Sequence, residues 1–74
     1  MADIYARVAG VIADVLADEG QLVAEGDQIA TVQLDSTGEV VTIVTETPGV
    51  LRELFVDIGS AVDDGDAIAF IDEA

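Results

Sequence analysis

The sequence contains no cysteine, histidine, tryptophan or lysine, and its two cationic side chains are Arg7 and Arg52. These absences exclude disulfides, metal sites built on Cys or His, thiol nucleophiles, imidazole bases and lysine Schiff bases. The carboxylates, hydroxyls and guanidiniums that remain show no pattern typical of catalysis. We therefore assign no catalytic, metal-binding or cofactor-binding residue, and expect a protein that is not an enzyme.

Long uncharged stretches are also missing. None approaches the roughly 18 residues that a membrane-spanning helix requires, and residues 1–10 lack the features of a secretory leader. We expect a cytoplasmic protein. The 74 residues, of which 51% are hydrophobic, predict a single domain over 1–74 with a thin core.

Charge of one sign dominates, with 16 acidic residues against two basic ones and a net charge of −14. Such a chain repels phosphate backbones and anionic lipids, so we expect neither nucleic-acid nor membrane binding. One interpretation is adaptation to high salt, which screens self-repulsion because the Debye length is only about 3 Å at 1 M. The other is steering toward a basic partner. Because the acidic residues are spread along the whole chain, we favour the halophilic interpretation.

An internal repeat organises the chain. Residues 10–32 and 49–71 align at a constant offset of 39, and nine of the 23 aligned pairs are identical. Between the repeated glycines lie short runs rich in Val, Ile and Thr, bounded by Gly, Asp or Pro, as is typical of strands. We predict an all-β domain of seven or eight short strands in two quasi-symmetric halves that bury their apolar faces against each other. The clearest predicted strands are 11–16, 28–32, 40–45, 50–56 and 67–71.

The repeated glycines are interpreted as turn positions, where φ is positive or backbones approach closely. The predicted structural turns are at Gly20, Gly26, Gly49, Gly59 and Gly65. Gly49 follows Thr47 and Pro48 in a segment with the composition of a tight turn.

The doubled pattern of glycines, valines and Gly-Asp pairs resembles the biotinyl and lipoyl carrier domains, such as biotin carboxyl carrier proteins. The resemblance extends over residues 4–72 and implies a barrel-sandwich hybrid, a flattened β-barrel of two similar halves. The residues that carry the resemblance are Gly20, Val23, Gly26, Asp27 and Ile29 in the first half, and Gly49, Gly59, Val62, Gly65, Asp66 and Ile68 in the second.

In that family a lysine at the tip of the central hairpin carries biotin or lipoate. Counting from Gly20 places the lysine position on Ser36, whereas counting back from Gly49 places it on Gly38, so the tip is two residues longer than the family's. No lysine is available in either register, and amide attachment of the usual kind is excluded. We expect no cofactor, and identify the tip as a protein-contact surface formed by Leu34, Asp35, Ser36, Thr37 and Gly38.

Two functions remain open. In the first, the protein is a non-catalytic accessory or interaction subunit that docks, without an arm, onto a biotin-dependent acyl-CoA carboxylase or a lipoate-dependent complex of the 2-oxoacid dehydrogenase type. In the second, it is a stand-alone binding module on the same scaffold, unrelated to carboxylase chemistry. The resemblance alone favours the first.

Other motifs have simpler interpretations. Ser36 beside Asp35 is similar to a phosphopantetheine attachment pair, but Asp and Ser are also ordinary turn residues. The acidic run 63–66 lacks the ligand spacing of a calcium loop and is better explained as a turn.

Local contacts are expected for most of the remaining polar and aromatic side chains. Arg7 and Arg52 are expected to pair with neighbours such as Asp3 and Glu53, although either guanidinium could instead contact an acidic partner. Among the aromatic residues, we expect Phe55 and Phe70 in the core and Tyr5 at the surface.

Overall fold

The computed structural model describes residues 2–73, which form eight β-strands and no helix. The strands are β1 (Ala2–Tyr5), β2 (Gly10–Val15), β3 (Leu22–Val23), β4 (Gln28–Leu34), β5 (Val40–Val44), β6 (Gly49–Leu54), β7 (Ala61–Val62) and β8 (Ala67–Glu73). The predicted all-β class and strand number are confirmed. The five predicted strands match β2, β4, β5, β6 and β8 with small differences at their ends.

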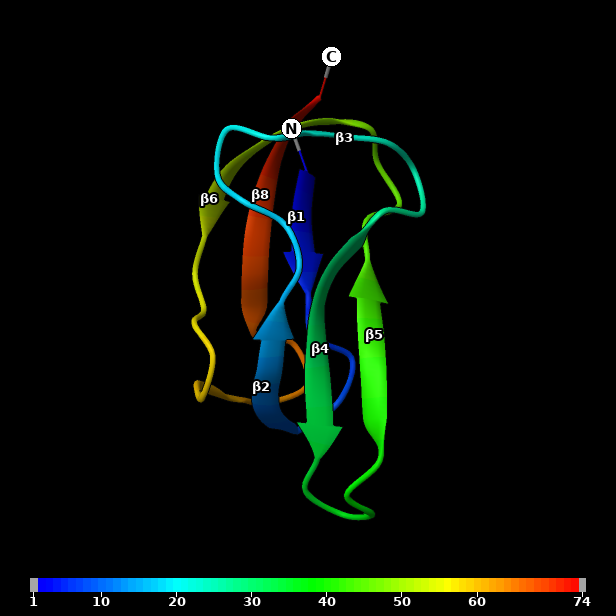
Figure 1. Cartoon of the computed structure of the whole chain (residues 1–74), viewed down its shortest axis with the longest axis vertical. Helices are drawn as coiled ribbons and strands as arrows, with labels where there is room; N and C mark the ends of the chain where they lie inside the picture. The colour runs from blue at the N-terminus through cyan, green and yellow to red at the C-terminus, as the bar shows by residue number, and fades with distance from the viewer. Residues whose placement is uncertain (1, 74) are drawn as a thin grey trace.

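Two four-stranded antiparallel sheets face each other (Figure 1). One has the strand order β1-β8-β6-β3 and the other β5-β4-β2-β7. The body is elongated, with extents of 36 × 19 × 18 Å. The sheets form the flattened barrel that the sequence resemblance implied.

The sequence repeat appears in the structure as an approximate twofold relation that exchanges the two sheets. An offset of 39 residues converts β2 into β6, β3 into β7 and β4 into β8, while β1 corresponds to β5. Hydrogen bonds obey the same relation: the Gly20 N–H donates to the Leu51 carbonyl at 2.7 Å, and the Gly59 N–H donates to the Ile12 carbonyl at 2.8 Å. Because each half's turn bonds to a strand of the other half, the halves depend on each other for closure.

The core fills the space between the sheets with aliphatic side chains from both halves. Its buried members are Ile4, Ala6, Ile12, Ala17, Val23, Ile29, Ala30, Val32, Leu51, Val56, Val62, Ile68, Ala69 and Ile71. Burying aliphatic side chains stabilises the fold by about 1.5–3 kcal/mol for each large one. Thr45 is the buried polar residue of the described chain, and its hydroxyl donates to the Thr47 carbonyl at 2.7 Å.

Matched β-bulges interrupt the pairing of β2 with β4 and of β6 with β8. The irregularities fall at Ala13 and Arg52, which are equivalent in the repeat. An extra residue reverses the in-and-out alternation of the strand beyond it. Leu51 is therefore buried before the bulge, and Val56, five residues later, is buried after it.

The aromatic predictions have different outcomes. Phe55 was expected in the core, and this is wrong: its side chain is 48% exposed. The bulge at Arg52 turns Phe55 outward by reversing the alternation. Phe70 is half-buried, and Tyr5 lies at the surface as expected.

Four of the five glycines predicted at turns lie in loops with positive φ. The angles are 87° for Gly20, 90° for Gly26, 91° for Gly59 and 97° for Gly65. Gly49 also has a positive φ, of 155°, but it is the first residue of β6 and not part of a tight turn. A Cβ atom there would collide with the carbonyl oxygen of Asp72. The close approach of β8 therefore requires glycine at this position.

Candidate functional site

The tip of the β4–β5 hairpin contains all five residues predicted as a partner contact. Figure 1 shows this hairpin extending beyond the other strands at one end of the molecule, whereas β1 begins and β8 ends at the opposite end. The tip therefore projects from the body of the domain at that end. This placement follows from the chain order, because the tip joins the two halves of the repeat.

The tip backbone forms a closed four-residue loop. The Leu34 N–H donates to the Glu39 carbonyl at 2.7 Å, and the Gly38 N–H donates to the Leu34 carbonyl at 2.9 Å. Gly38 has a φ of 77°, a conformation that glycine adopts without steric cost. The loop between Leu34 and Glu39 therefore has a defined shape.

Further hydrogen bonds fix the loop to its surroundings. The Thr37 hydroxyl oxygen accepts from the Glu39 N–H at 3.2 Å, and the Asp35 N–H donates to the Ala9 carbonyl at 3.2 Å. The latter bond joins the tip to the connection between β1 and β2. These contacts leave the loop ordered before any partner binds, which lowers the entropic cost of docking.

The side chains at the tip are polar and accessible. Asp35, Ser36, Thr37 and Gly38 are exposed, and Leu34 is half-buried. Within residues 2–73 the Ser36 hydroxyl forms no hydrogen bond and the Asp35 carboxylate forms no ion pair. The apex therefore presents a free hydroxyl and a free carboxylate.

An apolar pair that the sequence analysis missed lies beside the tip. Gln33 of β4 is opposite Val11 of β2 and Val40 of β5, and all three residues are exposed. Val11 is 38% exposed and Val40 is 59% exposed. The alternation of β2 and β5 could have identified them, because these valines occupy outward positions where a polar residue is usual.

The acidic run 63–66 forms a turn, in agreement with the preferred interpretation. The Asp63 N–H donates to the Asp66 carboxylate at 2.8 Å, and the equivalent Ala24 N–H donates to the Asp27 carboxylate at 2.8 Å. The paired geometry shows that Asp66 and Asp27 serve the turns of the two halves. No cluster of three potential metal ligands occurs within residues 2–73.

The two arginines have different surroundings. Arg52 pairs with Asp72 through a contact of 3.0 Å from Nε to Oδ2, so the predicted partner Glu53 is wrong. The β6–β8 register and the bulge place Asp72 across from Arg52. Arg7 forms no ion pair within the described chain, and the expected pairing with Asp3 is also wrong. The hydrogen-bond partner of Asp3 is Tyr5, whose hydroxyl donates at 3.0 Å.

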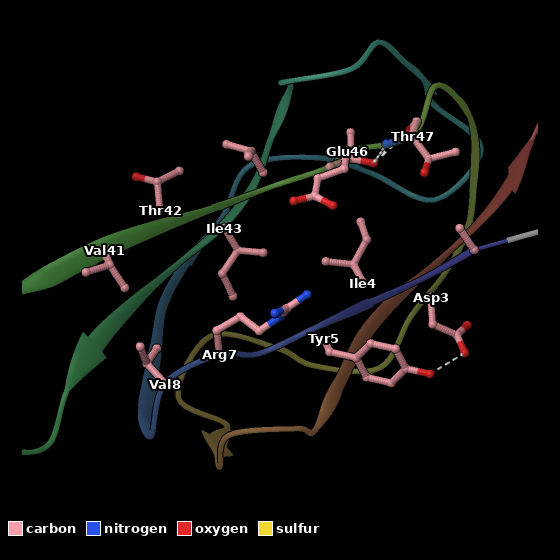
Figure 2. Close-up of a pocket in the computed structure, with 13 residues that line it drawn as sticks. Asp3, Ile4, Tyr5, Arg7, Val8, Val41, Thr42, Ile43, Glu46 and Thr47 are labelled. Carbon is pink, nitrogen blue, oxygen red and sulfur yellow. Dashed lines mark hydrogen bonds between the residues drawn. The ribbon is translucent and has the colours of Figure 1, made fainter.

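A second accessible feature is a cavity of about 430 Å³ between strands β1 and β5. Figure 2 shows Ile4 and Ile43 facing each other across it, with Val8 and Val41 at one end and the Arg7 side chain extending along its length. At the Asp3 end, the hydrogen bond to the Asp3 carboxylate raises the pKa of Tyr5 above its ordinary value, because the acceptor is anionic.

Comparison with solved structures identifies the architecture. The lipoyl domain of the 2-oxoglutarate dehydrogenase complex from Azotobacter vinelandii superposes with a TM-score of 0.79 at 23% identity, covering 99% of this chain and 98% of that one. The chain has the biotinyl/lipoyl-domain fold.

Two further structures agree. Truncated AcrA from Campylobacter jejuni superposes with a TM-score of 0.88 at 17% identity, covering 99% of this chain and 87% of that chain. Urea carboxylase from Kluyveromyces lactis gives 0.87 at 20% identity, covering 95% of this chain but 6% of the much longer enzyme. No protein-family model matches the sequence, and no curated protein matches it either.

The biotinyl/lipoyl-type domain formed by residues 2–73 contains no helix long and apolar enough to cross a membrane. Its hairpin tip lies where the carrier lysine of such domains is expected from the sequence resemblance. Ser36 is in the centre of the tip loop, whereas Gly38 closes it.

Proposed function

We propose that this protein is a carrier-like interaction subunit that docks through its β4–β5 tip without carrying a covalent cofactor. The natural partners are subunits of a biotin-dependent acyl-CoA carboxylase or of a lipoate-dependent complex of the 2-oxoacid dehydrogenase type. The protein is not itself an enzyme, and it acts in the cytoplasm. The observation that carries the proposal is the ordered tip at the carrier position, with Ser36 and not lysine at its apex.

The chemistry of the apex supports a docking role. Biotin and lipoate are attached through an amide, which requires a primary side-chain amine, and the chain has none. A free hydroxyl, a free carboxylate and two exposed valines can still form hydrogen bonds, ion pairs and apolar contacts with a protein surface. Because Asp35 and Glu39 are both acidic, the partner surface should carry arginine or lysine.

Two measurements test the proposal. The intact mass of the protein from its host should equal that of the unmodified chain, and affinity capture from the same host should recover carboxylase or dehydrogenase subunits. A mass increase matching biotin, lipoate or phosphopantetheine would contradict the absence of a cofactor. Capture of nothing, or of unrelated proteins alone, would contradict the partner class.

A matched pair of variants localises the contact. Replacing Asp35 and Ser36 together with alanine should abolish capture, because it removes the two free polar groups at the apex. Glu25→Ala also removes one negative charge, but from an exposed turn with no part in the tip, and should leave capture unchanged. An equal loss of capture in both variants would show that net charge, and not the tip, recruits the partner.

The alternative function is a stand-alone binding module unrelated to carboxylase chemistry. The cavity between β1 and β5 favours it, because this cavity is separate from the tip residues. A host partner that binds the Asp35→Ala/Ser36→Ala variant as well as the parent would support this alternative.

A further inference from the structure

Strand β5 is an unprotected sheet edge. The edge strands of the two sheets are β1, β3, β5 and β7, of which β3 and β7 have only two residues each. β5 has five residues, VVTIV, with no charge, glycine or proline. A long uncharged edge strand presents unpaired N–H and C=O groups that can pair with another strand. Proteins usually prevent this pairing with a charge, a proline or a bulge on the edge strand.

The twofold relation supplies an internal comparison. β1 is the counterpart of β5, and there Asp3 occupies the position of Thr42 and Tyr5 that of Val44. The Asp3 carboxylate, which accepts a hydrogen bond from the Tyr5 hydroxyl, therefore places a negative charge on the β1 edge. The equivalent residue on β5, Thr42, is neutral. In a chain with 16 acidic residues, the absence of charge from this edge distinguishes it.

The backbone of β5 has groups directed toward open space. The Glu39 carbonyl and the Thr45 N–H both bond toward the β4 side, to Leu34 and Asp27. Since successive residues of a strand bond to opposite sides, the N–H and C=O groups of Val40, Thr42 and Val44 face away from β4. Within residues 2–73 no other strand pairs with β5.

The cavity beside this edge has acidic side chains at one end, and a cationic side chain extends into it from the other end. Figure 2 shows Asp3 and Glu46 at one end, Val8 and Val41 at the other, and Arg7 entering from the Val8 end. The guanidinium of Arg7 has no carboxylate partner in the described chain. The walls between these ends are apolar, with Ile4 and Ile43 facing each other.

We propose that β5 binds an extended segment of a partner protein as an added antiparallel strand. The segment carries a cation at its N-terminal end, near Asp3 and Glu46, and a carboxylate further toward its C-terminal end, within reach of the Arg7 guanidinium that extends along the groove. The direction follows from β5 itself, which runs from Val41 toward Glu46, so that an antiparallel segment runs from Glu46 toward Arg7. Alternating apolar side chains of the segment would pack against Ile4 and Ile43.

Other occupants fit the groove less well. An aliphatic carboxylate could meet Arg7 and the apolar walls, but it would leave the edge N–H and C=O groups without partners. A second copy paired through β5 would bring Glu39 of one chain toward Glu46 of the other and join two chains of charge −14. The proposal uses the edge of β5, which shares Val40 with the proposed tip surface, and it does not depend on the proposed docking function.

Two capped synthetic peptides of identical composition provide the test. One has lysine at its N-terminal end, alternating threonine and valine in its centre, and glutamate at its C-terminal end; the other exchanges lysine and glutamate. Titration into the ¹⁵N-labelled protein, at the lowest salt where it is folded, should shift the Val40, Thr42 and Val44 amides with the first peptide. Equal affinity of the two peptides, or no shift of these amides at millimolar peptide, would overturn the proposal.

Variants of the protein separate backbone pairing from charge. Thr42→Pro removes an outward N–H and should abolish binding, whereas Thr42→Val keeps the N–H and should bind as well as the parent. Proline is tolerated where an edge N–H faces solvent. A Thr42→Pro variant whose spectrum shows an unfolded protein would therefore overturn the conclusion that the Thr42 N–H faces away from β4. Undiminished peptide binding by a folded Thr42→Pro variant would overturn the proposed strand pairing.

Matched charge variants test the role of Arg7. Arg7→Gln should weaken the first peptide about tenfold, the effect typical of one charge-assisted contact. Arg52→Gln removes the same charge from a paired site elsewhere and should leave binding unchanged. If both variants bind with equal affinity, the orienting role of Arg7 is wrong.

Controls identify the competing occupants. Sedimentation that shows a dimer without peptide, lost in Thr42→Pro, would assign the edge to a second copy and overturn the proposal. Octanoate that shifts the same amides equally in the parent and in Thr42→Pro would assign the groove to a small carboxylate, with the same consequence.

Discussion

Gly59 shows how one residue fixes a turn that holds the two halves together. Its N–H donates to the Ile12 carbonyl of the other half, and its φ of 91° lies where side chains with a Cβ are strained. A Cβ at this position would meet nothing within 4 Å. The requirement for glycine is therefore conformational and does not come from crowding.

Gly59→Val should lower the free energy of unfolding by about 1–3 kcal/mol, since a β-branched residue is poorly tolerated at positive φ. Gly59→Asn should cost less, because asparagine enters this region more easily. Urea unfolding of both variants measures the difference. A valine variant as stable as the parent would contradict the strained conformation, and equal costs for both would point to another cause.

At the scale of the element, the bulge at Arg52 decides which side of the chain beyond β6 is buried. Leu51 faces the core, and the extra residue reverses the alternation so that Val56, and not Phe55, returns to it. The composition of an apolar run predicts a strand but does not reveal an inserted residue. This is why the strand was predicted correctly while the position of Phe55 was not.

Phe55→Ser should change the free energy of unfolding by about 0.5 kcal/mol or less, as expected for an exposed residue away from special features. Val56→Ser should cost more than about 1 kcal/mol, because it places a hydroxyl in the core. Thermal or urea unfolding compares the two neighbours directly. A larger effect at Phe55 than at Val56 would show that the alternation is not reversed.

At the scale of the whole molecule, the repeat explains how much could be anticipated from sequence. Matching glycines and apolar pairs at an offset of 39 indicated two similar halves and a β-barrel. The tip could be located because it lies between the halves. The groove could not, because it depends on how two edge strands distant in sequence, β1 and β5, approach in space.

The ion-pair partner of a charged side chain could not be predicted from its neighbours in the sequence, for the same reason. Neighbours along the chain suggested Glu53 for Arg52, but strand pairing brings Asp72, 20 residues away, to the guanidinium. In a sheet, the residue opposite is set by register and bulges, which a single sequence specifies weakly. Which carboxylate meets Arg52, and whether any meets Arg7 within residues 2–73, are therefore properties of the fold.

The net charge of −14 is expected to lower the stability of the whole molecule at low salt, because like charges repel each other. The ion pair of Arg52 with Asp72 joins side chains that are 57% and 43% exposed, so added salt weakens little attraction there while it screens the repulsion among the carboxylates. We expect the melting temperature to rise with NaCl, by about 4–8 °C for each kcal/mol of repulsion relieved. Calorimetry across a salt series measures this.

The Arg52→Gln variant should show the same rise in melting temperature with salt, beginning from nearly the same melting temperature as the parent, because an exposed pair contributes about 1 kcal/mol or less. A melting temperature that is flat or falls with salt would show that repulsion among the carboxylates is not what limits stability, and would remove the support for halophilic adaptation.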